Sequence, residues 1–83
     1  MQINREAFER ELRHVVAGRN PALELGAGLY TRQEVVRALL HIGVGGHDVN
    51  TILTGCVQDG LLRSEGEPPR FRLMVRYAAQ GNA

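Results

Sequence analysis

The sequence predicts one small α+β domain in which three helices are followed by a β-hairpin. Three segments between Asn4 and Asp59 place apolar residues at the helical repeat of about 3.6 residues and are bounded by capping or glycine signals. After Gly60 the apolar residues alternate with polar ones, which is typical of strands. The chain has 83 residues, enough for one compact domain and too few for two.

The composition is that of an ordinary globular domain, with 43% hydrophobic and 23% charged residues. No apolar run approaches the roughly 18 residues that span a bilayer. The N-terminal segment MQINREAFERELR is too charged for a secretory signal. The single cysteine, Cys56, cannot form an intramolecular disulfide and is typical of a reducing compartment. We therefore expect a cytoplasmic protein without a membrane partner.

The charge balance is nearly neutral, with a formal net charge of +1. This value excludes the strongly basic footprint that many nucleic-acid-binding domains carry. The ten basic residues are all arginines, whose planar guanidinium groups suit contacts with phosphates and carboxylates.

The first helix is expected from Asn4 to Ala17. Asn4 is a suitable N-cap because its side chain can accept a hydrogen bond from a free backbone N–H in the first turn. Gly18 is expected to end the helix in a left-handed conformation. The helix presents one apolar stripe, formed by Ala7, Phe8, Leu12, Val15 and Val16.

Residues 18–29 contain three glycines and a proline, so they are expected to form an irregular connector. A short strand is expected near Leu29–Thr31. The second helix begins at Thr31, where the string T-R-Q-E forms a capping box with Glu34, and it ends at Gly43. Its expected buried stripe is Val35, Val36, Leu39 and Leu40.

The third helix is expected from about Asp48 to Asp59, with Asp48 as its cap and Gly60 as its stop. Gly55 lies inside it, although glycine costs about 1 kcal/mol relative to alanine there. Two interpretations of Gly55 remain open, namely close approach of DNA or another helix, and tight packing inside the fold. The expected apolar face is Val49, Ile52, Leu53, Cys56 and Val57.

Two strands are expected next, Leu61–Ser64 and the segment 70–77, joined by the loop E-G-E-P-P. In the second strand, apolar residues and arginines alternate, so one face is expected to be buried and the other rich in arginine. The inward set is Phe71, Leu73, Val75 and Tyr77, and the outward set is Arg70, Arg72, Met74 and Arg76. Residues 1–77 are expected to form the domain, and residues 78–83 a disordered tail.

The stretch from Tyr30 to Leu73 resembles the winged-helix superfamily of DNA-binding domains, in the form found in bacterial regulators. The matching features are a capped helix ending in the turn Ile42–Val44, a second helix ending in the string D-G-L-L over Asp59–Leu62, and a hairpin. The resemblance implies a helix-turn-helix core with the hairpin as its wing. It also implies a transcriptional regulator that places its third helix in the major groove of double-stranded DNA. A domain this small and weakly basic makes few phosphate contacts, so we expect it to bind a two-fold site as a homodimer.

The resemblance assigns DNA contacts to the outward face of the third helix and to the wing. Asn and Gln side chains can bind adenine, and Thr can contact bases or phosphates. Arginines in the wing, and Arg32 at the start of the second helix, suit phosphates. The expected DNA-binding residues are Arg32, His47, Asn50, Thr51, Thr54, Gln58, Arg63, Arg70 and Arg72.

A second interpretation is a winged-helix interaction module that binds a protein partner, or a second copy of itself, without DNA. The third helix favours it, because no Arg or Lys occurs between His41 and Arg63 and Asp48 would repel a phosphate. The polar helix face would then be solvated, and the wing arginines would keep the outer sheet face soluble.

No enzymatic, metal or cofactor site is expected. No Ser/His/Asp or paired-carboxylate constellation stands out, and the G-V-G-G turn lacks the residues of a phosphate-binding loop. His14, His41, His47 and Cys56 match no zinc spacing, and Cys56 belongs to an apolar stripe.

Overall fold

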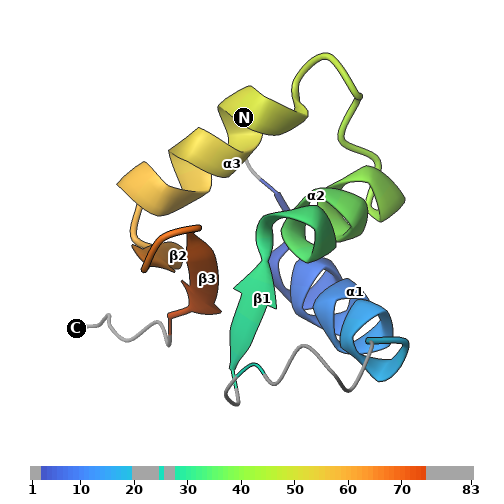
Figure 1. Ribbon diagram of the computed structural model, residues 1–83. Coiled ribbons are helices and arrows are strands. Elements are labelled where there is room, and N and C mark those ends of the chain that lie inside the picture. Colours follow the sequence, from blue (N-terminus) through green and yellow to red (C-terminus); the bar gives the residue numbers. More distant parts are fainter. Residues whose placement is uncertain (1–2, 20–24, 26–27, 75–83) are drawn as a thin grey trace, which may run out of the picture.

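Three helices and three strands make up the fold in the computed structural model, which describes residues 3–19, 25 and 28–74. The elements are α1 (Arg5–Ala17), β1 (Leu29–Thr31), α2 (Arg32–His41), α3 (Val49–Gln58), β2 (Leu62–Glu65) and β3 (Arg70–Leu73) (Figure 1). The strands form one antiparallel sheet of order β1-β3-β2. This is the predicted α+β fold, in a winged-helix-like layout.

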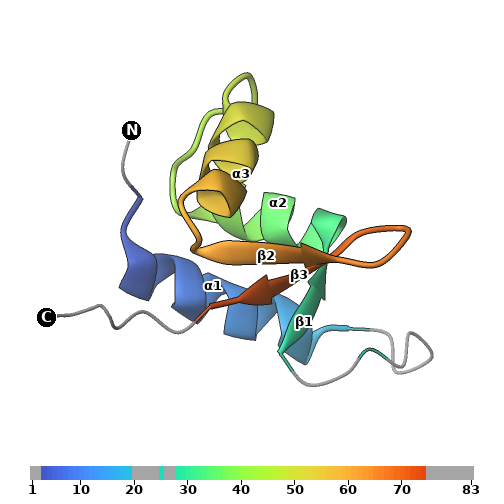
Figure 2. The same cartoon turned by 90° about the vertical axis from the view of Figure 1, so that its left-hand side faces the viewer.

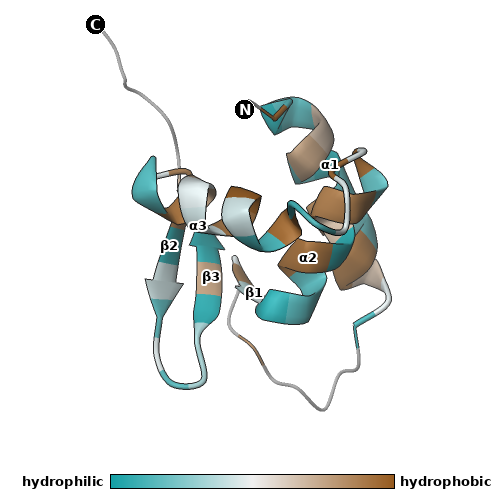
Figure 3. Cartoon of the chain, turned by 90° about the horizontal axis from the view of Figure 1, so that it is seen from above, coloured by the Kyte–Doolittle hydropathy of each residue, from teal (hydrophilic) through white to brown (hydrophobic). Residues whose placement is uncertain are grey.

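In the central strand of the sheet, β3, the side chain of Phe71 packs into the core. Phe71 is paired with Tyr30 of β1 on one side and with Ser64 of β2 on the other, and it is buried. Because side chains alternate along a strand, Arg70 and Arg72 lie on the opposite face. Helix α3 lies over β2, and the β2–β3 hairpin projects away from the helices (Figures 2 and 3).

The hairpin differs slightly from the predicted strands. β2 begins at Leu62 rather than Leu61, because the N–H of Leu61 bonds to the end of α3. β3 ends at Leu73, and Met74 already lies outside the strand. The rest of the predicted strand and the predicted tail, residues 75–83, lie outside the described residues.

The core joins all three helices to the sheet, and the inner face of α3 is confirmed because Val49, Leu53 and Cys56 are buried. The predicted stripe of α2 is only half right. Leu40 is 43% exposed, whereas the small Ala38 is fully buried because α2 turns that side toward α1. The buried apolar residues are Phe8, Leu12, Val35, Ala38, Leu39, Val44, Val49, Leu53, Cys56, Leu62 and Phe71.

Two of the predicted helix starts are confirmed. The Asn4 side chain accepts from the N–H of Ala7 at 3.0 Å. Thr31 Oγ1 accepts from the N–H of Glu34 at 3.1 Å, and Glu34 Oε1 accepts from the N–H of Thr31 at 2.9 Å. These bonds satisfy backbone donors that have no partner inside the helix.

Two end signals differ from the prediction. Asp48 occupies the predicted N-cap position of α3, but its side chain makes no cap bond because its backbone is helical rather than extended. Gly18 has a φ of −97° rather than a left-handed conformation. Its N–H donates to the Val15 carbonyl at 3.2 Å, so α1 ends in a tightened turn that any residue can adopt.

Helices α2 and α3 end in the same way, each followed by a left-handed glycine. Gly43 has a φ of +104° and Gly60 a φ of +84°. In both cases the residue after the glycine donates its N–H back to the last turn, Val44 to Leu39 at 3.1 Å and Leu61 to Cys56 at 2.9 Å. A helix end of this form favours glycine strongly, because other residues are strained at a positive φ.

Candidate nucleic-acid interface

The outward face of α3 is polar and uncharged. Asn50, Thr51, Thr54 and Gln58 are all exposed, and His47 is exposed in the turn before the helix. The helical repeat places these four α3 residues together, opposite the buried inner face. The helix itself contains no basic residue. It therefore offers hydrogen-bonding groups to a partner but no cation.

Arg32 places a cation beside the beginning of this face. It is the first residue of α2, and its Nη2 donates a hydrogen bond to Oδ1 of Asn50 at the beginning of α3. The contact joins the two helices of the helix-turn-helix at the surface, because both side chains are exposed. The Asn50 amide NH₂ remains able to donate elsewhere.

The outer face of the hairpin holds four charged side chains, Arg63 and Glu65 on β2 and Arg70 and Arg72 on β3, which we call the wing quartet. In the strand register Arg63 lies opposite Arg72, and Glu65 lies opposite Arg70. Residues that alternate along paired strands share a face, so all four belong to the same surface.

Glu65 is bonded within the wing quartet. Arg72 Nε donates to Oε2 of Glu65 at 3.0 Å, and Arg72 Nη2 donates to Oε1 at 3.3 Å. Arg63 Nε lies 3.8 Å from the same Oε2. The bond from Arg72 lowers the pKa of Glu65, and it raises the pKa of Arg72. Both groups are therefore charged at neutral pH, and the quartet keeps an excess of positive charge.

Arg70 is turned toward the loop of the hairpin. Its Nη1 contacts the carbonyl oxygens of Pro68 and Pro69, each at 3.4 Å. These long contacts are to neutral acceptors, so the charge of Arg70 is not compensated by them.

The predicted site residues thus fall into two groups. Arg32, His47 and the α3 residues lie at the helix-turn-helix, and Arg63, Arg70 and Arg72 lie on the wing. Within residues 28–74, no hydrogen bond or ion pair joins the α3 face to the wing quartet. A partner that contacts both groups would have to span the two surfaces.

The sequence prediction gives no bridging role to Glu65. The length of the hairpin loop in the sequence nevertheless indicates this role. A loop of four residues, Gly66–Pro69, sets Glu65 directly opposite Arg70 and diagonal to Arg72.

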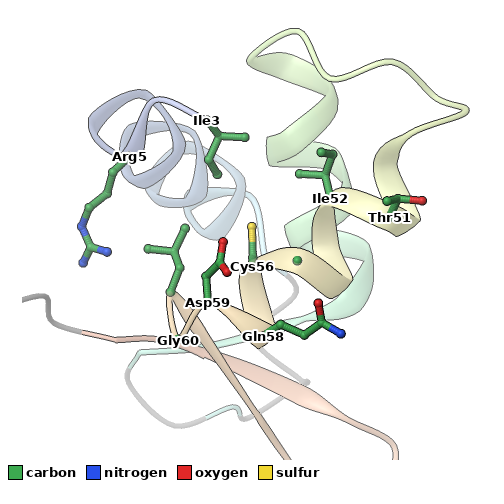
Figure 4. Close-up of a pocket in the computed structure, with 10 residues that line it drawn as sticks. Ile3, Arg5, Thr51, Ile52, Cys56, Gln58, Asp59 and Gly60 are labelled. Atoms are coloured by element: carbon green, nitrogen blue, oxygen red, sulfur yellow. The ribbon is translucent and has the colours of Figure 1, made fainter. Parts of the chain in front are cut away.

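Gly55 borders a groove of about 700 Å³ that runs between the beginning of α1, α3 and Leu61 (Figure 4). A Cβ at Gly55 would meet nothing within 4 Å, so tight packing inside the fold is the wrong explanation for this glycine. Ile3 and Ile52 line the groove, together with Gln58 from the outward face of α3.

Cys56 also borders the groove but is only 6% exposed. Burial, followed by the nearby charge of Asp59, raises the pKa of its thiol. It therefore behaves as an apolar core residue. Among residues 3–19, 25 and 28–74, no three His, Cys, Asp or Glu side chains lie close enough to hold a metal ion.

No family model, curated protein or solved structure matches this chain. None of the helices in the described part of the chain has the length and apolar character needed to cross a membrane.

Proposed function

We propose that this protein is a winged-helix DNA-binding protein that regulates transcription, with α3 as its recognition helix and the β2–β3 hairpin as its wing. The observation that carries the proposal is the contact between Arg32 and Asn50. It supplies a phosphate-binding cation at the beginning of a helix that has polar base-contacting groups and no cation of its own.

In this proposal α3 enters the major groove of double-stranded DNA. Asn50 and Gln58 bind base edges, Thr51 and Thr54 contact bases or phosphates, and Arg32 binds a phosphate at the groove edge. Arg63, Arg70 and Arg72 bind phosphates beside the groove. A single domain makes few such contacts, so a homodimer on a two-fold site would add the affinity that one domain lacks.

Salt-dependent DNA binding tests the proposal. Fluorescence anisotropy with a pool of random-sequence duplexes gives the binding constant at several salt concentrations. The variant R70A/R72A should bind more weakly, and its plot of log K against log salt should be shallower by about 1.8, or about 0.9 for each lost phosphate contact.

The matched control is R10A/R13A, which removes the same charge from two exposed positions of α1. Its salt dependence should stay close to that of the wild type. Absence of binding to any duplex at low salt, or equal slopes for the two variants, would contradict the proposal.

A protein-interaction module is the second candidate, and the groove beside Gly55 favours it. Ile3 and Ile52 offer apolar surface there, and Leu40 is exposed on α2. Recovery of a stoichiometric protein partner or a self-associated form, combined with no shift of any duplex, would support this candidate over DNA binding.

A further inference from the structure

We propose that Arg63 and Arg72 form a binding site for a DNA phosphate on the wing, and that Glu65 occupies this site in the free protein. The inference rests on the proposed function. It adds that the wing inhibits its own contact with DNA until a phosphate replaces the Glu65 carboxylate.

The strand register favours an anion at this position. Arg63 and Arg72 are direct cross-strand neighbours, and two like charges placed opposite each other destabilise a strand pair. Glu65 Oε2 lies 3.0 Å from Nε of Arg72 and 3.8 Å from Nε of Arg63. One carboxylate therefore bridges two guanidinium groups, and this is the arrangement of an occupied anion site.

The donors that hold Glu65 are those that a phosphate would use. Arg72 presents Nε and Nη2 side by side to the two carboxylate oxygens, at 3.0 and 3.3 Å. Two phosphate oxygens accept the same pair of parallel hydrogen bonds from an arginine. A backbone phosphate can thus replace the carboxylate without any change in the orientation of the Arg72 guanidinium group.

The other end of the Arg72 guanidinium group lies near Gly28, since a Cβ added at Gly28 would come 3.5 Å from Nη1 of Arg72. Gly28 has no side chain to bond this group. The hydrogen bonds that orient the Arg72 guanidinium are therefore those to Glu65.

Exchange of the anion does not require the core to open. The side chain of Arg63 is 67% exposed, that of Arg72 is 40% exposed, and that of Glu65 is 33% exposed. Exposed ion pairs add little to folding stability, because water and salt screen them. A polyanion such as DNA can therefore compete with Glu65 for the two arginines.

The test compares Glu65→Gln with Glu67→Gln, because each substitution removes one negative charge from the wing. Glu67 is exposed in the loop that follows β2. Duplex binding is measured by fluorescence anisotropy for the wild type and both variants over a range of salt concentrations. Thermal unfolding followed by circular dichroism verifies that all three proteins are folded.

E65Q is expected to bind duplex DNA about tenfold more tightly than the wild type at 50 mM salt, because no carboxylate has to leave the two arginines. Its slope of log K against log salt should stay close to that of the wild type, since both complexes contain the same phosphate contacts. E67Q is expected to change the affinity for duplex by about twofold or less, because it alters only the overall electrostatic potential of the wing. Equal effects of the two variants, or weaker binding by E65Q, would overturn the inference while DNA binding itself stands. If neither the wild type nor a variant binds duplex, the proposed function fails as well.

Discussion

Two arginine–glutamate pairs in this molecule share their chemistry but differ in their surroundings. Arg19, the second residue after α1, pairs with Glu34 in the first turn of α2 through two hydrogen bonds of 2.8 Å. Arg72 and Glu65 connect β3 to β2, with bonds of 3.0 and 3.3 Å. The side chains of the first pair are 14% and 10% exposed, and those of the second are 40% and 33% exposed.

Contacts with the backbone further distinguish the buried pair from the exposed one. Arg19 Nη2 also donates to the Leu29 carbonyl at 2.7 Å, and Glu34 Oε1 also accepts from the N–H of Thr31 at 2.9 Å. The Arg19 guanidinium group lies 6.0 Å from the centre of the Tyr30 ring. The first pair therefore ties together α1, β1 and α2, whereas the wing pair joins only side chains on one exposed face. Burial and backbone bonds therefore decide whether such a pair stabilises the fold or can exchange its anion.

The largest expected effect comes from breaking the buried pair. Glu34→Gln should lower the free energy of unfolding by about 3 kcal/mol, because it leaves the largely buried Arg19 cation without its counter-charge. Glu65→Gln should lower the free energy of unfolding only slightly, because the wing pair is exposed and screened by water. Urea unfolding followed by circular dichroism measures both. A similar loss in the two variants would contradict the distinction between the pairs.

The dependence of folding stability on pH gives a second measurement of the effect of Glu34→Gln. Burial alone would raise the pKa of Glu34, but hydrogen bonds from Arg19 and Thr31 outweigh it and lower the pKa below its ordinary value of 4.5. A lowered folded-state pKa contributes stability above the ordinary value, and this stability is lost as the pH falls through the folded-state pKa. The stability difference between wild type and E34Q should therefore shrink as the pH falls below 4.5.

Smaller effects on stability, of opposite sign, are expected from alanine substitutions at Gly60 and Gly55. Gly60→Ala should destabilise the protein by about 1 kcal/mol, because its positive φ is costly for any residue with a Cβ. Gly55→Ala should stabilise the protein by up to about 1 kcal/mol, since the position is helical and open. Thermal unfolding distinguishes the two signs. Destabilisation by G55A would mean that the fold, rather than a ligand surface, requires this glycine.

The sequence predicted the features that depend on local signals. The capping box of Thr31 and Glu34, the ends of the second and third helices at Gly43 and Gly60, and the inner face of α3 each follow from residues within one helix length. Leu40 was placed inside wrongly, because an apolar stripe does not reveal how far a helix is rotated toward its neighbours.

Contacts between distant residues could not be predicted in the same way. Arg19 lies in a segment without a regular pattern, and its pairing with Glu34 spans 15 residues. The contact of Arg32 with Asn50 and the bridging of two arginines by Glu65 depend on side-chain conformations and strand register. The charged residues of the candidate interface could thus be predicted from the sequence, whereas the partners that they contact in the free protein could not.

Side-chain NMR of the arginine Nε–H groups during titration with duplex DNA tests the central claim most directly, since it observes both ion pairs in one sample. The Nε–H resonances of Arg72 and Arg32 should shift progressively as duplex is added, whereas that of Arg19 should stay in place. An unchanged Arg72 resonance at saturating duplex, or an equal shift of Arg19, would contradict the claim that the wing pair is exchangeable and the buried pair is not.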